Sequence, residues 1–302
     1  MRPRVVIGVP LYNGSDHLGE ALESLLSQTY ADFELVVVDD CSTDGSHEIV
    51  SSYAATDRRI HLSRNDTRLG LVGNWRRTFE LARALHADLD YFAWASDHDL
   101  WQRRWLESLV PQLDAHPETV LTYPHMGTVS QSGERLRRTP PALDTSGVDE
   151  PRRRADLTWQ SGGFGYRIYG LFRARALERC GVLRYVYMPD RLLLTELALH
   201  GEYREVPEVL WYRRRTGNAS IERQRAAFFP DRKPPLRFRV RWFYSHSAIL
   251  FWSLAIRGRA RPALSRTGGA LMAARYLKLG RAHKSGRHAR ERVGLKRQQA
   301  RR

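Results

Sequence analysis

The sequence predicts an α/β fold: a mostly parallel sheet covered by helices on both faces. Three observations predict it. Apolar, β-branched runs alternate with amphipathic helical patterns, polar residues follow the ends of several runs, and 42% of the 302 residues are hydrophobic. Alternating strands and helices are typical of sheets built from βαβ units. Ligands of such sheets bind at the carboxyl ends of the strands, so the polar residues there are the candidate site.

Apolar runs predict strands over residues 5–9, 33–38, 60–62, 91–95 and 120–123. The first run ends at Pro10, where a buried strand would open into a loop. Helical spacing of apolar residues fills the intervals, over 18–26, from Ser46 onward, over 73–86 and over 105–113, and it returns over 171–179 and 190–200. Residues 124–160 are rich in Pro, Arg and Ser, so we expect a variable surface segment without regular secondary structure there.

Positive charge is concentrated at the end of the chain. The formal net charge is +16, yet residues 231–302 hold twenty Lys or Arg against Asp231 and Glu291, and residues 1–230 hold 29 basic and 31 acidic residues. We therefore predict a globular domain at 1–230 and a basic, helical C-terminal extension at 231–302, disordered from about residue 281.

Residues 242–256 are mostly apolar, but they are fewer than the roughly 20 that a membrane-spanning helix needs. Arginines flank this stretch on both sides. A helix of this kind either packs on the domain or lies in an anionic membrane interface, and both alternatives stay open. Two cysteines, Cys41 and Cys180, suit a reducing compartment, and the apolar run at 5–9 is too short for the core of a signal peptide. We expect a cytoplasmic protein, peripheral at the inner face of the cell membrane if the extension binds lipid.

Two acidic clusters follow predicted strands. Asp97 and Asp99, with His98 as a spacer, offer hard oxygen ligands for Mg²⁺ or Mn²⁺. The alternative is a helix N-terminus, where acidic side chains interact favourably with the dipole. Asp39 and Asp40 follow the strand at 33–38, where a carboxylate can accept hydrogen bonds from a nucleotide. A polar turn that caps the next helix is the alternative there.

Four segments occur in an order typical of one enzyme family. They are Val9–Asn13, Leu25–Tyr30, Phe33–Ser46 and Ser96–Trp101. In these segments the chain resembles the family 2 glycosyltransferases, which have the Rossmann-like nucleotide-diphospho-sugar transferase fold called GT-A. The resemblance covers about residues 4–123 and continues more loosely to about residue 216.

The resemblance implies roles for individual residues. The nucleotide-binding residues would be Pro10, Tyr12, Asn13, Asp39, Asp40, Asn74 and Arg77, with Asp40 at the base. Asp97 and Asp99 would bind the metal, with Asp99 the more direct ligand. Asp190 resembles the family's general base, although a helix N-cap is the alternative. Arg213, Arg214 and Arg215 would contact the diphosphate, although a solvated charge run is the alternative.

The family's activity would then be the expected function. The resemblance implies a metal-dependent, inverting glycosyltransferase that moves a sugar from a UDP or dTDP donor to a cell-surface glycan or lipid-linked acceptor. One alternative is a nucleic-acid-binding protein that uses the basic tail, but the acidic clusters would repel nucleic acid. A non-catalytic sugar-nucleotide binder is the other, and the intact acidic residues Asp97, Asp99 and Asp190 argue against it.

Overall fold

The computed structural model describes residues 3–130, 134–138, 143–161, 164–214, 228–229, 238, 240–261 and 263–299. The strands in these ranges are β1 (Val5–Leu11), β2 (Phe33–Asp39), β3 (Ile60–Arg64), β4 (Tyr91–Trp94), β5 (Leu100–Trp101), β6 (Thr119–Val129), β7 (Arg135–Arg138), β8 (Leu171–Arg173) and β9 (Glu202–Arg214). The helices are α1 (Ser15–Leu26), α2 (Ser46–Ala54), α3 (Gly70–Leu85), α4 (Trp105–Ala115), α5 (Pro151–Ser161), α6 (Phe164–Arg167), α7 (Ala174–Cys180), α8 (Pro189–Leu197), α11 (Trp242–Leu250), the π-helix η1 (Phe251–Ile256) and α12 (Arg266–Gln299).

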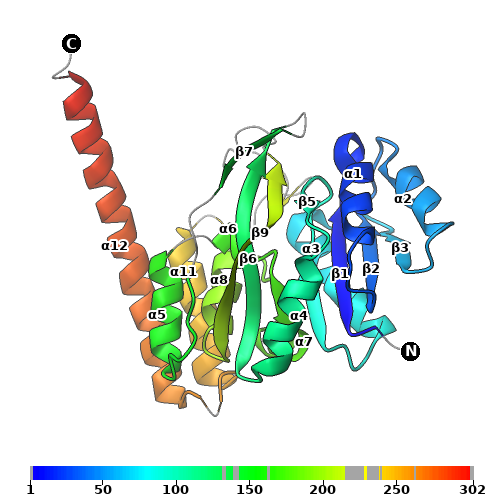
Figure 1. Ribbon diagram of the computed structural model, residues 1–302. Helices are drawn as coiled ribbons and strands as arrows, with labels where there is room; N and C mark the ends of the chain where they lie inside the picture. Colours follow the sequence, from blue (N-terminus) through cyan, green and yellow to red (C-terminus); the bar gives the residue numbers. More distant parts are fainter. Residues whose placement is uncertain are drawn as a thin grey trace. The chain divides into compact units, whose positions relative to one another are not determined.

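One sheet organises the first part of the chain, with strand order β3-β2-β1-β4-β8-β6-β9-β5 and β7 paired to β6. The first four strands are parallel, and β1 lies between β2 and β4. Beyond β4 the sheet is mixed, because β8 runs antiparallel to both β4 and β6 while β6 and β9 are parallel. The predicted α/β class is confirmed (Figure 1). The parallel arrangement that the sequence predicts is complete only in this first half.

Helices cover both faces of the parallel half, as the sequence predicts. On one face, α1 and α4 bury Leu22 and Leu109 in a core that also contains Ile7 of β1. On the other face, α3 packs so closely that a Cβ at Gly8 would lie 2.5 Å from Thr78 of α3. The edge-to-face contact between Phe79 and Phe92, at 5.0 Å between ring centroids, continues this second core.

Two segments differ from the sequence predictions. Residues 171–173 form β8 rather than the start of a helix, because Leu171 and Phe172 are fully buried and pair with strands on both sides. A short apolar run cannot be assigned to helix or strand by spacing alone. Residues 124–160 are also more regular than expected. The strand β6 continues to Val129, through a register shift at Pro124, and α5 covers residues 151–161.

The chain divides into two compact units, residues 1–185 with 189–233, and residues 186–188 with 234–302. The second unit contains α11, η1 and α12. Its interior includes His246, whose Nδ1 lies 2.7 Å from the Tyr276 hydroxyl and whose Nε2 lies 2.7 Å from the Tyr187 carbonyl oxygen. The backbone of α12 is helical to Gln299, where the composition predicts a disordered end. The residues there are mostly good helix formers such as Arg, Ala and Gln, with few apolar side chains to pack.

Across the described ranges, no helix combines the length and the apolar character that crossing a membrane would require.

Candidate active site

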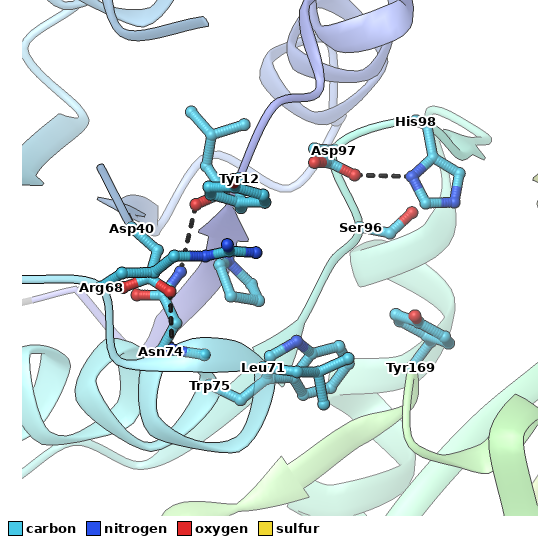
Figure 2. Close-up of a pocket in the computed structure, with 13 residues that line it drawn as sticks. Tyr12, Asp40, Arg68, Leu71, Asn74, Trp75, Ser96, Asp97, His98 and Tyr169 are labelled. Atoms are coloured by element: carbon cyan, nitrogen blue, oxygen red, sulfur yellow. Dashed lines mark hydrogen bonds and ion pairs between the residues drawn. The ribbon is translucent and has the colours of Figure 1, made fainter. Parts of the chain in front are cut away.

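A pocket of about 280 Å³ lies at the carboxyl ends of β1, β2 and β4 (Figure 2). Its walls come from the loops that follow these strands, from the start of α3 and from the segment before β8. The lining residues are Pro10, Leu11, Tyr12, Asp40, Arg68, Gly70, Leu71, Asn74, Trp75, Ser96, Asp97, His98 and Tyr169. The structure thus brings together Pro10, Tyr12, Asp40, Asn74 and Asp97, which the sequence selects from separate motifs.

Asp40 joins the end of β2 to the start of α3. Its Oδ1 accepts hydrogen bonds from the backbone N–H of Leu69 at 2.7 Å and from the side-chain amide of Asn65 at 2.8 Å. Its Oδ2 accepts from the N–H of Gly70 at 2.8 Å. A carboxylate at a helix N-terminus satisfies donors that have no partner within the helix. Asp40 therefore fixes the first turn of α3, which forms one wall of the pocket.

Asn74 holds the ends of β1 and β2 together from its position on α3. Its side-chain N–H₂ donates to the carbonyl oxygens of Leu11 at 3.2 Å and Val38 at 2.9 Å, and its Oδ1 accepts from Asn65 at 3.0 Å. The side chain is 3% exposed. Because these bonds cross three elements, Asn74 sets the shape of the pocket floor.

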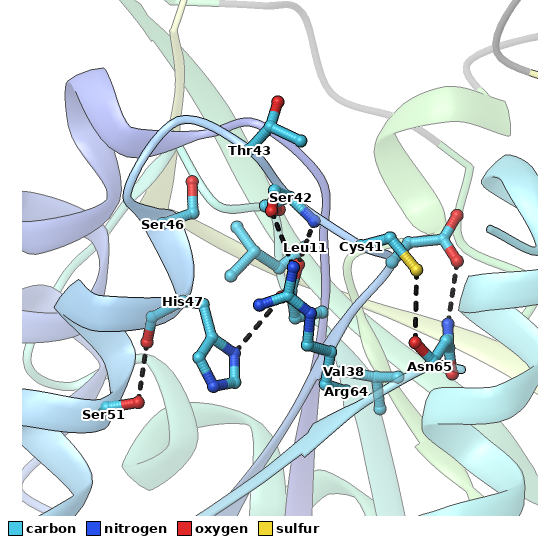
Figure 3. Close-up of polar contacts among 12 residues, drawn as sticks. Leu11, Val38, Cys41, Ser42, Thr43, Ser46, His47, Ser51, Arg64 and Asn65 are labelled. Carbon is cyan, nitrogen blue, oxygen red and sulfur yellow. Dashed lines mark hydrogen bonds and ion pairs between the residues drawn. The ribbon is translucent and has the colours of Figure 1, made fainter. Parts of the chain in front are cut away.

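Asp39 lies beneath the loop that follows β2 and does not line the pocket. Its side chain is fully buried, and its Oδ1 accepts a hydrogen bond from the N–H of Ser42 at 2.9 Å. Its Oδ2 lies 3.2 Å from His47 Nδ1 and 3.5 Å from Arg64 Nε. Arg64 also donates to the Ser42 carbonyl oxygen at 2.9 Å (Figure 3). These contacts order the loop that carries Asp40.

Asn13 also supports this loop from outside the pocket. It has a positive φ of 49°, its Oδ1 accepts from the N–H of Thr43 at 2.9 Å, and its own N–H donates to Ser42 Oγ at 3.0 Å. Asn tolerates the left-handed region better than most residues, because its short side chain bonds locally.

Tyr12 is paired with Arg68, a residue outside the motifs that predict the site. The guanidinium carbon of Arg68 lies 3.7 Å from the centroid of the Tyr12 ring, and both side chains line the pocket (Figure 2). Arg77, which the sequence does select, is exposed on α3 and is absent from the pocket lining. Arg68 could have been selected from its position in the sequence. It lies between Asn65 and Gly70, which both donate hydrogen bonds to Asp40.

The two aspartates of the acidic motif after β4 have different surroundings: Asp97 lines the pocket and Asp99 does not. Asp97 lines the pocket, its side chain is 15% exposed, and its Oδ1 lies 2.6 Å from His98 Nδ1. His98, which the sequence analysis treats as a spacer, also lines the pocket. Burial lowers the pKa of His98, but the hydrogen bond and charge of Asp97, with the charge of Asp99, outweigh burial and raise it.

Asp99, the more direct ligand in the sequence-based expectation, is 1% exposed and lies outside the pocket lining. Its Oδ1 accepts from the backbone N–H of Arg214 at 2.8 Å, and its Oδ2 accepts from the indole N–H of Trp211 at 3.1 Å. Burial raises the pKa of its carboxyl group. Asp99 thus connects the acidic motif to β9.

The arginines at the end of β9 differ from one another. Arg214 is 1% exposed, and its guanidinium donates to the carbonyl oxygens of His98 and Ser130 and to Glu20. It therefore holds the acidic motif in place and is not available as a diphosphate clamp. Arg213 is exposed, and its guanidinium carbon lies 5.9 Å from the centroid of the Tyr166 ring. The positive charge of Arg213 acts to lower the pKa of His98 and of Tyr169. Arg215 lies outside the described residues.

Tyr169 connects the pocket with the acidic residues and with Asp190. Its ring contacts Trp75 and Trp211, with centroids 5.8 and 4.8 Å away. Burial raises the pKa of its hydroxyl, and the charges of Asp99, Asp97 and Asp190 raise it further. Asp190 does not line the pocket itself. It lies in the first turn of α8, and burial raises the pKa of its carboxyl group.

The residues of the pocket suit a hard divalent cation. Mg²⁺ is usually held by one or two carboxylates together with substrate phosphates, and Asp97 presents a carboxylate to the pocket. Gly14 makes room for it, since a Cβ at that residue would lie 2.4 Å from Asp97 Oδ2. Asp99 lies outside the pocket lining, but its carboxylate oxygens each retain a second lone pair beside the hydrogen bonds described above. This oxygen set fits Mg²⁺ or Mn²⁺ better than a soft metal.

Comparison with known proteins agrees with this geometry. The family model described as Glycosyl transferase family 2 matches residues 6–181, more than half of the chain. The chain belongs to glycosyl transferase family 2. This family 2 member is 33% identical over 147 residues to the putative glycosyltransferase EpsE of Bacillus subtilis (strain 168), a match covering 48% of this chain and 51% of EpsE. It is 31% identical over 106 residues to the putative teichuronic acid biosynthesis glycosyltransferase TuaG of the same organism, covering 35% of this chain and 40% of TuaG.

The match therefore spans about half the length of these relatives or less. Two solved structures resemble this family 2 chain over nearly its whole length. S. aureus TarS 1-349 in complex with UDP-GlcNAc has a TM-score of 0.56 at 14% identity, over 94% of this chain and 92% of TarS 1-349. The mannosyltransferase PcManGT from Pyrobaculum calidifontis, in complex with GDP-Man and Mn²⁺, has a TM-score of 0.52 at 21% identity, over 93% and 87%. At such identities the likeness establishes the fold, and the predicted GT-A fold is confirmed.

Proposed function

We propose that this protein transfers a sugar from a nucleotide-diphosphate donor to a hydroxyl group of an acceptor glycan or lipid-linked acceptor. The observation that carries the proposal is the single pocket in which the strand-end residues Tyr12, Asp40 and Asp97 meet. Membership of family 2, together with structural neighbours solved in complex with UDP, UDP-GlcNAc and GDP-Man, supports a nucleotide-sugar donor.

The nucleoside of the donor would bind between Asp40 and the Tyr12–Arg68 pair. Aromatic rings and guanidinium planes offer flat faces on which a base can stack, with a cation–π contribution. A UDP or dTDP donor is our assignment. Asp39 and Asn13 would support donor binding indirectly, because they order the loop that carries Asp40. Asn74 would support it by shaping the pocket floor. Arg68 replaces Arg77 as the basic residue that we assign to the donor.

The diphosphate would lie toward Asp97, with Arg213 as the exposed cation on that side. A Mg²⁺ or Mn²⁺ ion held by Asp97 and Asp99 would neutralise charge on the departing diphosphate as a Lewis acid. Asp99 is fixed by Trp211 and by the backbone of Arg214, so the acidic motif cannot turn away from the pocket without breaking buried hydrogen bonds. This preorganisation reduces the rearrangement needed when the donor binds.

Asp190 is our candidate for the general base of an inverting transfer. The acceptor hydroxyl attacks the anomeric carbon, its proton passes to the Asp190 carboxylate, and the bond from the anomeric carbon to the diphosphate oxygen breaks. Burial supports this role because a carboxylate with a raised pKa is a stronger base. The charge of Asp190 raises the pKa of Tyr169, which lines the pocket, and this supports the role.

The C-terminal extension would hold the enzyme at an anionic membrane surface where a lipid-linked acceptor resides. Large apolar side chains are exposed on its described part: Tyr244, Phe251, Trp252, Ile256 and Leu271. Glu291 is the one acidic residue between 234 and 302. Apolar side chains inserted among lipid headgroups, with arginines beside them, are typical of interfacial helices. We also propose a cytoplasmic location, at the inner face of the cell membrane.

A donor screen tests the function directly. We expect a UDP- or dTDP-sugar with Mn²⁺ to raise the melting temperature of the full chain, because a ligand that binds the native state stabilises it. Asp97→Asn should lose most of this shift and reduce sugar transfer by at least about 100-fold, the scale at which losing one electrostatic group affects turnover. A variant with normal transfer and normal Mn²⁺ response would refute the assignment of the pocket.

A further inference from the structure

A second cluster of metal-ligating side chains lies at the opposite end of the parallel strands from the pocket. It consists of Glu34, at the start of β2, His61 on β3, and His86, directly after α3. One ligand atom from each side chain lies within 4.8 Å of the others. None of the three residues lines the pocket.

The two imidazoles converge on one carboxylate oxygen. His61 Nε2 lies 2.7 Å and His86 Nε2 lies 2.8 Å from Glu34 Oε2. The ring centroids are 6.3 Å apart, and the rings are nearly perpendicular. A carboxylate oxygen approached by two imidazole nitrogens resembles the His₂Glu sets that hold Zn²⁺ and leave a coordination position open.

The backbone at this cluster is well fixed. His61 is in parallel register with Val36 of β2. The N–H of His86 donates to the Ala82 carbonyl oxygen at 3.0 Å, and its own carbonyl oxygen accepts from the N–H of Leu89 and from Arg83 Nη1, both at 3.2 Å. The three side chains therefore start from positions that do not need a loop to reorganise.

The cluster is also accessible to an ion. The side chains of His61, His86 and Glu34 are 35%, 15% and 23% exposed. With metal–ligand distances of about 2.1 Å, the ligand atoms of a tetrahedral site lie about 3.4 Å apart. The present separations of 2.7 and 2.8 Å would therefore have to widen by about 0.6 to 0.7 Å, a small side-chain rotation.

We propose that Glu34, His61 and His86 form a site for a divalent transition metal, with Zn²⁺ the best match, that joins β2, β3 and the end of α3. Imidazole nitrogen with a carboxylate oxygen suits Zn²⁺ and disfavours Mg²⁺, so this site and the pocket differ in metal preference. The ion would stabilise the parallel half of the sheet, and the opposite ends of β2 and α3 carry Asp40 and Asn74 of the pocket.

Zinc binding by the full chain tests the proposal. After removal of any affinity tag and treatment with EDTA, Zn²⁺ is titrated against a chromophoric chelator near neutral pH. We expect the double variant His61→Ala/His86→Ala to bind one Zn²⁺ per chain fewer than wild type. Glu34→Gln, which keeps the shape of the side chain, should weaken that site by at least about tenfold, as even loss of an outer partner does.

The control is His116→Ala. His116 Nδ1 lies 3.3 Å from Glu118, so it is also a histidine beside a carboxylate, but this pair includes only one histidine. It should bind as much Zn²⁺ as wild type. Melting temperatures in EDTA show whether the variants are folded. On adding Zn²⁺, the wild type and His116→Ala should gain melting temperature, Glu34→Gln should gain less, and the double variant should gain none. Equal zinc stoichiometry and affinity in all the variants would overturn the proposal and leave a hydrogen-bonded cluster only.

Discussion

At the scale of single residues, Gly14 controls where the Asp97 carboxylate can lie. The backbone there has φ of −115°, which alanine also adopts, so steric contact alone decides the effect of a substitution. A Cβ would stand 2.4 Å from Asp97 Oδ2. We expect Gly14→Ala to fold, because the far end of Asp97 can shift, but to lower kcat/KM at limiting Mn²⁺ by at least about tenfold. Steady-state kinetics at varied Mn²⁺ measure this.

Gly19→Ala is the matched control on the following helix. Its Cβ would be 3.6 Å from the Tyr53 hydroxyl, an ordinary contact. This variant should keep wild-type kinetics and gain up to about 1 kcal/mol of stability from helix propensity. Identical kinetics for the two variants would argue against a role for Asp97 in the reaction.

Asp190 gives a prediction in which activity and stability move in opposite directions. Because burial raises the pKa of its carboxyl group above 3.8, the ionised form is disfavoured in the folded protein. Stability contributed by this group is present below the unfolded pKa and is lost as the pH rises through the folded pKa. We therefore expect Asp190→Asn to raise the melting temperature near neutral pH.

The same substitution should lower kcat by about 10²- to 10⁴-fold with little change in donor KM. In the wild type, the acid limb of kcat/KM should lie above the pH at which an ordinary aspartate titrates. Calorimetry and a pH–rate profile measure the two effects. A fall in melting temperature together with normal kcat would support a helix-capping role instead.

Sequence could identify residues of the pocket where a motif ends a strand, as for Tyr12, Asp40 and Asp97. It could not identify Arg68, because the stacking on Tyr12 depends on how the loop before α3 folds around Asp40. It also could not separate Arg213 from Arg214. Alternation along β9 buries the second and exposes the first, and a run of identical residues contains no sign of which strand face each occupies.

At the scale of secondary-structure elements, Asp99 attaches β9 to the acidic motif. Asp99→Ala would leave the Trp211 indole N–H and the Arg214 backbone N–H without this acceptor. Each buried donor left unpaired costs about 1–3 kcal/mol. We expect Asp99→Ala to be destabilised by at least about 2 kcal/mol in urea unfolding, whereas Asp97→Ala should change stability by less than about 1 kcal/mol.

Both variants should lose transfer activity, so stability is the measurement that separates them. A stable Asp99→Ala protein would mean that β9 is held by its neighbours in the sheet alone. In that case only the proposed role of Asp99 at the metal ion would remain.

Element types followed from the sequence wherever apolar residues had a clear period, as in α1, α4 and the parallel strands. Prediction failed for β8 and for the second half of β6. There, burial on both faces and pairing with neighbouring strands override local preference. The antiparallel pairs of β8 likewise depend on contacts between residues about 50 to 80 apart in the chain, which no local pattern contains.

At the scale of the whole molecule, the exposed apolar residues of the extension predict membrane binding. Phe251 and Trp252 are 46% and 55% exposed, and the Arg257 guanidinium carbon lies 5.9 Å from the Trp252 ring centroid. We expect Phe251→Ser/Trp252→Ser to reduce co-sedimentation with phosphatidylglycerol vesicles severalfold. High salt should weaken wild-type binding, since screening reduces attraction between exposed charges.

Leu85→Ser is the control, because Leu85 of α3 is an exposed apolar residue of comparable exposure, 43%, outside the extension. It should pellet like wild type. Equal pelleting of all three proteins would remove the membrane proposal, and tight binding of RNA by the wild type at physiological salt would favour the nucleic-acid alternative.

Composition located the charge asymmetry at residue 231, but it could not show that residues 186–188 group with the extension. That grouping depends on the contacts of Tyr187, whose ring lies 5.0 Å from that of Phe238 and whose carbonyl oxygen accepts from His246. Contacts between residues this far apart in the chain cannot be predicted from local sequence patterns.

The grouping constrains how such a chain can be rearranged by recombination. Because residues 186–188 precede α8 whereas the rest of their unit follows residue 233, one crossover near residue 233 would exchange an incomplete module. The residue equivalent to His246 in the new tail would then have to form its hydrogen bond with residue 187 of a different parent chain. A functional chimaera would need three junctions, at 185/186, 188/189 and 233/234, or a single junction ahead of residue 186, so that one parent supplies both Tyr187 and the tail.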